Sequence, residues 1–390
     1  MPAANTIQSG DFRIDIAESD LTDLRSRLEC TRWPEEPAEV GWDRGVPLAY
    51  LRELAEYWAT GYDWWEHEAS LNEVPQARTV IDGQAVHLLH ARSPERSARP
   101  LVLLHGWPGS VVEFLPVIER LRDPRGHDGD PADAFHVVVP SLPGFGFSVP
   151  LQGTGWSSGR IARTVAVLME ELGYERYAAH GSDVGAGVAG GLSGIAPDRV
   201  MGVHLASDPR TAVTFATFSG DPAGNPALSA EERATVARVA EESEDDLGYL
   251  RMQSTRPQTI AYGLTDSPVA QLAWIIEKVH AWTDPSKDLP EHAVDLDLLL
   301  TNVSLYWLTR SGASAAHVLY DGMHAEDWGQ PGPAPTGWAV FGRESFTRKL
   351  LDPDGHIEHW VEYDRGGHFP AMEVPELLVA DIRRFFRCLR

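Results

Sequence analysis

The sequence predicts an α/β protein with a mainly parallel sheet that a block of helices interrupts. From Pro100 onward, buried strand-like runs such as PLVLLHG and FHVVVPSLPG alternate with helix-like runs such as SGRIARTVAVLMEELG. This alternation is typical of a parallel sheet with helices on both faces. It stops near Asp208 and returns at Thr336 with TGWAVFG and IEHWVEYDRGGHF. We therefore expect a helical segment inserted into the sheet at residues 209–320.

The first 95 residues predict helices followed by a β-hairpin. Leucines 21, 24 and 28 stand at helical spacing, and a second apolar period begins after Pro47. Asp82-Gly83 separates two strand-like runs, which indicates a tight hairpin turn. We divide the chain into an N-terminal region (1–95), a core (96–208 and 321–390) and the helical segment (209–320). The N-terminal helices should wrap around the core and contact the helical segment.

Composition excludes several classes of protein. The 390 residues include 57 acidic and 33 basic side chains, a net charge of −24, which argues against binding to nucleic acid or an anionic membrane. The two cysteines, Cys30 and Cys388, form no metal or redox spacing, which predicts reduced thiols. The chain has no 18-residue apolar run and no apolar N-terminal leader. We expect a cytoplasmic protein that acts on a small molecule.

A glycine-rich turn, AAHGSDVGAGVAGG, follows a strand-like run at residues 178–191. Gly185 to Gly190 matches the G-x-G-x-x-G fingerprint of dinucleotide sites. That fingerprint normally lies in the first strand-to-helix turn of its unit, whereas here several strands precede it. We therefore favour close packing of a helix on the sheet over an NAD-linked oxidoreductase.

Two stretches of the sequence are candidates for the nucleophile elbow of a hydrolase. Residues 155–159, GWSSG, match the serine motif G-x-S-x-G, but a loop precedes them, so Ser157 or Ser158 is expected to cap the next helix. Residues 181–185, GSDVG, follow a strand and place Asp183 between two glycines that relieve crowding in a sharp turn. The alternative for Asp183 is a simple helix cap.

The surroundings of Asp183 favour a nucleophile. The loop HGWPGS after an early strand can aim the Trp107 backbone N–H at the elbow, where it would form an oxyanion hole with the Val184 N–H. His368 lies in the loop after the last strand, in the order nucleophile, acid, base. The first carboxylate after TGWAVFG is Glu344.

With these motifs in place, the chain resembles the microsomal-type epoxide hydrolases of the α/β-hydrolase fold, as a soluble, bacterial-like member. The resemblance covers nearly the whole chain and includes HGWPGS, PGFGFS, GYLRMQSTRPQT, SPVAQLAWIIEK, LLTNVSLYW, PTGW and RGGHFPAMEVPELLVADIRRF. It implies Asp183 as nucleophile, Glu344 as orienting acid and His368 as base. It also implies two epoxide-activating tyrosines, Tyr249 and Tyr320.

The chain departs from the family pattern in three ways. Position 184 is Val where many members carry an aromatic residue. The segment between Tyr320 and Glu344 is shorter than in mammalian members, which makes Asp321 and Asp327 alternative acids. The hydrophobic N-terminal anchor of the mammalian members is absent.

This chemistry explains a carboxylate at the elbow. A carboxylate that attacks an epoxide carbon forms an ester that water can hydrolyse, whereas a serine would form a stable ether. The tyrosines would donate hydrogen bonds to the epoxide oxygen, and His368 would activate the water that attacks the ester. We expect a small apolar epoxide, a vicinal diol product, no cofactor and no metal. A role in natural-product or antibiotic assembly is one expectation, and the oligomeric state stays open, a homodimer included.

Two other functions stay open from the residues alone. A haloalkane dehalogenase also uses an elbow aspartate with a histidine and an acid, and it would release halide. A non-catalytic binding protein of the same fold would lack the nucleophile or the base, and this sequence offers candidates for both, Asp183 and His368.

Overall fold

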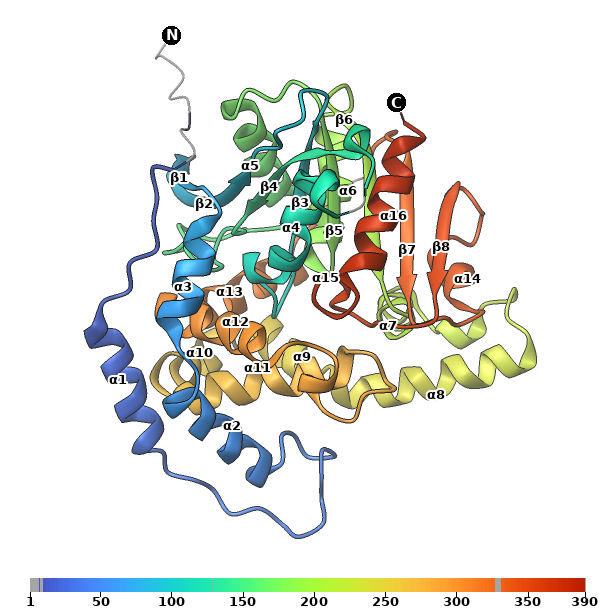
Figure 1. Cartoon of the computed structure of the whole chain (residues 1–390). Coiled ribbons are helices and arrows are strands. Elements are labelled where there is room, and N and C mark those ends of the chain that lie inside the picture. Colours follow the sequence, from blue (N-terminus) through green and yellow to red (C-terminus); the bar gives the residue numbers. More distant parts are fainter. Residues whose placement is uncertain (1–6, 8–9, 128, 327–330, 390) are drawn as a thin grey trace.

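The strands form one mixed sheet. The structure, a computed structural model, describes residue 7 and residues 10–127, 129–326 and 331–389. In these residues the strand order is β1-β2-β4-β3-β5-β6-β7-β8 (Figure 1). The first two neighbouring pairs are antiparallel and the other five are parallel, so the predicted mainly parallel sheet is confirmed. The strands are β1 (Gln76–Ile81), β2 (Gln84–Ala91), β3 (Arg99–Leu104), β4 (Phe135–Pro140), β5 (Tyr177–Ser182), β6 (Val200–Ser207), β7 (Thr336–Phe341) and β8 (His359–Tyr363).

The predicted hairpin joins β1 and β2. Ile81 pairs with Gln84, so only Asp82 and Gly83 form the loop. Their φ angles are +49° and +81°, the left-handed values that a two-residue hairpin turn with the twist of its strands requires.

Helices cover both faces of the sheet. In Figure 1, α4 (Leu115–Arg122) and α16 (Pro375–Arg387) lie in front of the sheet, and α5 (Ser158–Glu171) and α6 (Val184–Ile195) lie behind it. The face of α16 toward the sheet buries Leu378, Ile382 and Phe385, which follow helical spacing. The Ser157 side chain accepts the Arg160 N–H at 3.1 Å, so this serine caps α5 as expected.

A helical insertion separates β6 from β7. Its helices lie at the carboxyl ends of the parallel strands, below the sheet in Figure 1. They are α7 (Pro209–Ser219), α8 (Ala230–Asp246), α9 (Gly248–Thr255), α10 (Pro257–Asp266), α11 (Pro268–Trp282), α12 (Leu296–Thr309) and α13 (Ser311–Met323). The remaining helices are α1 (Glu18–Glu29), α2 (Leu48–Thr60), α3 (Trp64–Glu73), α14 (Thr347–Leu351) and α15 (Pro370–Glu373), with 3-10 turns η1 (Val111–Phe114), η2 (Pro124–His127), η3 (Pro131–Asp133), η4 (Pro222–Gly224) and η5 (Pro290–His292).

The N-terminal helices lie against this insertion, at α11 and α12. The Trp58 indole N–H donates to Ser304 Oγ at 2.8 Å, and the Tyr62 hydroxyl lies 3.0 Å from Thr301 Oγ1. These contacts link residues about 240 positions apart and hold the outer side of α12. Among the helices in the described part of the chain, none is long and apolar enough to span a membrane.

Candidate active site

Asp183 stands at a strained turn between β5 and α6. Its φ of +52° and ψ of −127° are unusual for a residue with a side chain and cost about 1–3 kcal/mol. A Cβ at Gly181 would lie 2.2 Å from the Gly185 carbonyl oxygen, and a Cβ at Gly185 would lie 1.9 Å from the Leu104 oxygen. Only glycine fits at both positions, and the sharp turn presents the carboxylate at the carboxyl edge of the sheet.

Two backbone N–H groups face this carboxylate, as the sequence predicts. The Trp107 N–H donates to Asp183 Oδ1 at 2.9 Å, and the Val184 N–H also binds the carboxylate. Burial alone would raise the pKa of Asp183, but its hydrogen bond to His368, that residue's charge and the two N–H groups together lower it. Asp183 is therefore an ionised carboxylate.

Helix α12 fixes the loop that supplies the Trp107 N–H. Asn302 Nδ2 donates to the Pro108 carbonyl at 2.8 Å, and Asn302 Oδ1 accepts the Ser110 hydroxyl at 2.7 Å. The Tyr306 hydroxyl donates to the Gly109 carbonyl at 2.8 Å. The sequence signal for this clamp is a pair of polar residues four positions apart, Asn302 and Tyr306, that are buried in a mostly apolar helix. Sequence reasoning did not assign them this contact.

His368 lies between two carboxylates. Its Nε2 is 3.5 Å from Asp183 Oδ2, and its Nδ1 is 3.0 Å from Asp208 Oδ2. The Thr211 hydroxyl lies 3.1 Å from the same Nδ1, and the Thr211 N–H donates to Asp208 Oδ1 at 2.9 Å. Asp208 follows β6 and caps α7, so the first turn of that helix holds its carboxylate in place.

The carboxylate at His368 Nδ1 is Asp208, whereas the predicted acid was Glu344. Glu344 lies in the loop between β7 and α14, exposed to solvent, and no contact joins it to His368 although the structure describes both residues. Asp208 lies at Nδ1 instead. Of the two alternatives, Asp321 accepts the Trp156 N–H at 2.9 Å and so ties α13 to another loop, and Asp327 lies outside the described residues.

The two carboxylates control the charge of His368. Burial alone would lower the pKa of this imidazole, but the hydrogen bonds to Asp183 and Asp208 and their negative charges raise it to about 10. With both carboxylates ionised, His368 is an imidazolium at neutral pH. It can become a base only after one of these charges is lost.

The two predicted tyrosines lie in different surroundings. The Tyr249 ring, on α9, stacks on the Trp107 ring with centroids 4.6 Å apart and meets Trp282 edge-on at 5.2 Å. Burial and the charges of Asp183 and Glu277 raise its pKa well above the ordinary value, so the phenol is protonated.

Tyr320, on α13, stacks on His324 at 4.2 Å and lines a surface groove. Leu151 and Pro257 line the same groove. Among the described residues no contact joins Tyr320 to Asp183, so its role stays a prediction.

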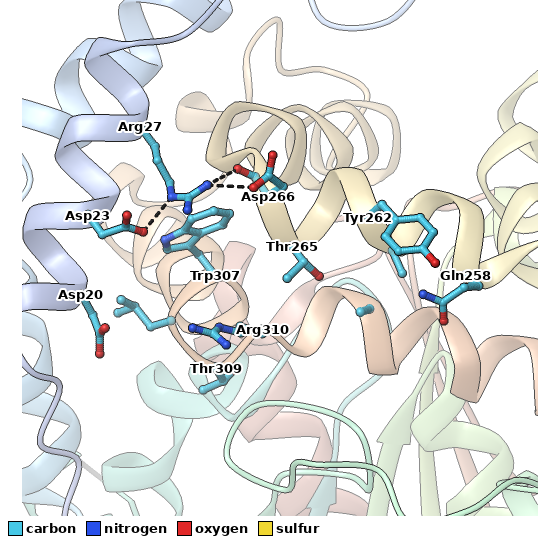
Figure 2. A pocket seen from close by; sticks show the side chains of 13 residues that line it. Asp20, Asp23, Arg27, Gln258, Tyr262, Thr265, Asp266, Trp307, Thr309 and Arg310 are labelled. Carbon is cyan, nitrogen blue, oxygen red and sulfur yellow. Dashed lines mark hydrogen bonds and ion pairs between the residues drawn. The ribbon is translucent and has the colours of Figure 1, made fainter.

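A neighbouring surface hollow does not contain the reacting groups. Figure 2 shows it between α1 and the insertion, where Arg27 bridges Asp23 and Asp266 and lies over Trp307. Neither Asp183 nor His368 lines this hollow. It adjoins the groove of Tyr320, with which it shares Gln258, Thr309, Arg310 and Ala313.

Two further carboxyl groups lie near His368. Glu113, in η1, accepts the Ser182 hydroxyl at 3.4 Å, and burial raises its pKa to about 8 against the opposing charge of His368. Burial also raises the pKa of Glu373 to about 7, although it accepts the N–H groups of Asp284 and Phe369. Glu113 is therefore neutral at pH 7. Its place in the apolar run VVEF was a signal that the sequence analysis did not use.

One cluster has the residue types of a metal site. His204, His359 and Asp381 bring three donor atoms together on the α16 side of the sheet. Both histidine Nε2 atoms lie within hydrogen-bond distance of Asp381 Oδ2, at 3.0 and 3.1 Å, and the Tyr363 hydroxyl donates to Oδ1 at 2.9 Å. Three side chains of the protein, His204, His359 and Tyr363, thus provide hydrogen-bond partners for the Asp381 carboxylate.

Family models match most of the chain. The model described as "Epoxide hydrolase N terminus" matches residues 9–114, and the model described as "alpha/beta hydrolase fold" matches residues 99–271. The predicted α/β-hydrolase fold is therefore confirmed.

Proteins similar over nearly the whole chain are named as epoxide hydrolases. The chain is 44% identical to a "Putative epoxide hydrolase" of Stigmatella aurantiaca over 97% of this chain and 85% of that protein. It is 32% identical to "Epoxide hydrolase 1" of Sus scrofa over 97% of this chain and 88% of that protein. The solved structure of Aspergillus niger epoxide hydrolase matches with a TM-score of 0.82 at 32% identity, over 100% of this chain and 98% of that one.

Proposed function

Because this chain belongs to the epoxide hydrolase family, we propose that it opens its epoxide through an ester on Asp183. The observation that carries this proposal is the ionised Asp183 carboxylate at the elbow, bound by two backbone N–H groups and lying 3.5 Å from His368. A carboxylate so placed can attack a saturated carbon, and the same N–H groups can stabilise the oxyanion that forms when water attacks the ester.

In the first step, Asp183 attacks an epoxide carbon and the carbon–oxygen bond breaks. The electron pair moves to the epoxide oxygen, which takes the Tyr249 hydroxyl proton. One negative charge thereby moves from Asp183 to Tyr249. The position of Tyr249 on the Trp107 ring supports this role, because the backbone N–H of the same Trp107 is one of the two that bind Asp183. Tyr320 is proposed as a second donor on the evidence of the family resemblance alone.

Ester formation then allows His368 to act as a base. The ester on Asp183 is neutral, so His368 loses one of the two charges that raise its pKa. His368 can give up its proton while Tyr249 regains one, which leaves a neutral imidazole beside the ester. Asp208, 3.0 Å from Nδ1, orients this ring and stabilises the imidazolium that forms when His368 takes a proton from water.

The helical insertion is proposed to act as a cap over the elbow. It supplies Tyr249 and Trp282, which form a chain of ring contacts from Trp107 to Phe369, and Trp282 and Phe369 both contact the His368 ring. Such a wall favours a small epoxide with apolar substituents and excludes bulk water from the ester.

A single turnover in heavy-oxygen water tests the covalent ester. We expect ordinary oxygen in the diol and the label in Asp183, because water attacks the carboxyl carbon. In His368→Gln the ester should accumulate and be visible by mass spectrometry. Heavy oxygen in the first-turnover diol, with no adduct, would show direct attack by water. Release of halide from haloalkanes with no diol formation would favour a dehalogenase instead.

A further inference from the structure

A buried cation, Lys278 on α11, lies over the ring of Tyr249. Its side chain is 2% exposed, and its Nζ lies 5.0 Å from the centroid of the Tyr249 ring and 6.0 Å from that of Trp282. Nζ donates to the Asp246 carbonyl at 3.0 Å and to Glu277 Oε1 at 2.7 Å. These two bonds fix the ammonium group over the ring.

Burying a charged lysine is unfavourable, so the position needs a reason. Burial lowers the pKa of Lys278, and the Glu277 carboxylate opposes this effect. A carboxylate partner and a carbonyl keep the group charged, but an apolar side chain of similar length would fill the same space without the cost of desolvation.

The reaction supplies that reason, given the function proposed above. Charge leaves Asp183 and arrives on the Tyr249 oxygen as the epoxide opens. Asp183 and Glu277 both disfavour negative charge on this phenol. Glu277 pairs with the ammonium at 2.7 Å, but its side chain is 31% exposed, so water weakens the effect of its charge on the ring more than that of the 2% exposed Lys278.

We propose that Lys278 is a positioning residue for Tyr249 that stabilises the negative charge developing on the phenol as it protonates the epoxide oxygen. The cation attracts the ring face of the neutral phenol and attracts the phenolate more strongly. Its contribution is therefore larger in the transition state than in the resting enzyme, which is the condition for raising the rate of alkylation.

A double-mutant cycle tests this inference. The rate of ester formation is measured by rapid quench and mass spectrometry in the wild type, Lys278→Met, Tyr249→Phe and the double variant. We expect Lys278→Met to slow alkylation at least tenfold and to leave ester hydrolysis within twofold. In the Tyr249→Phe background, where no phenolate forms, the same change should cost less than twofold. Lys278→Arg should recover part of the rate.

Glu277→Gln is the matched control. It removes the carboxylate that helps to keep Lys278 protonated, so alkylation is compared with the wild type over a range of pH. At the acid end, where Lys278 stays protonated, the variant should keep the wild-type rate or exceed it. Should Lys278→Met fail to fold, as judged by circular dichroism, Lys278→Gln replaces it, because its amide can still donate to the Asp246 carbonyl.

The outcomes are distinguishable. Equal losses from the lysine change in both backgrounds would mean that Lys278 only supports the fold of the insertion, and would overturn this inference alone. An undiminished alkylation rate in Tyr249→Phe would overturn the proposed role of the tyrosine and this inference with it.

Discussion

Replacing Asp208 by Asn removes the carboxylate charge at His368 and leaves the shape of the side chain. The Nδ1–Oδ2 distance is 3.0 Å and both side chains are buried, so a hydrogen bond to a charged partner is lost. Such a bond contributes about 1.5–3 kcal/mol. Since each ~1.4 kcal/mol is a tenfold change in rate, ester hydrolysis should slow by about 10- to 150-fold.

Alkylation should respond much less, because the contacts of Asp183 with the Trp107 and Val184 N–H groups stay in place. The two steps are separated by single-turnover mass spectrometry, which follows the alkylated protein as it forms and decays. Asp208→Asn should therefore accumulate ester in the steady state.

Glu344→Gln is the control for this experiment. Glu344 is exposed, and surface substitutions usually change free energies by no more than about 0.5 kcal/mol, or roughly twofold. If Glu344→Gln slowed hydrolysis and Asp208→Asn did not, the acid would come from β7, and our assignment of Asp208 would be wrong.

Three further predictions use stability and titration. Gly185→Ala should prevent folding or lower the Tm sharply, because its Cβ would lie 1.9 Å from a carbonyl oxygen. Gly190→Ala in the same helix, where a Cβ would have nothing within 4 Å, should raise the stability by about 0.5–1 kcal/mol. The opposite order of Tm values would refute the elbow geometry. In the folded protein Glu113 keeps its proton up to about pH 8, whereas in the unfolded chain it loses the proton above about pH 4.5, so wild-type stability falls as the pH rises between these values. The Tm of Glu113→Gln should therefore increase relative to that of the wild type between pH 5 and pH 8. A difference in Tm that did not change with pH would contradict a neutral buried carboxyl group. In Asp183→Asn the pKa of His368 should fall from about 10 toward its ordinary value, measured by NMR of the ring, and an unchanged value would exclude Asp183 as a source of the shift.

Local features of this chain could be predicted from the sequence. The hairpin depends on Asp82-Gly83, and the elbow depends on glycines two positions either side of Asp183, so neighbouring residues are sufficient to predict both. The acid could not be assigned in this way. The order nucleophile, acid, base is satisfied by Asp208 after β6 as well as by Glu344 after β7. The choice depends on which loop approaches His368, and that depends on the packing of the folded chain.

Contacts on two sides of α12 bind this helix of the insertion to the rest of the protein. This helix binds the N-terminal region through Ser304 and Thr301 and binds the HGWPGS loop through Asn302 and Tyr306. A motion that lifted α12 would break both sets of bonds and displace the Trp107 N–H. Substrate entry by movement of the whole insertion would therefore disable the oxyanion hole. Engineers who wish to change substrate preference should leave α12 with the core, keep the residues of α7, α9 and α11 that contact His368 or Trp107, and vary other positions of the insertion.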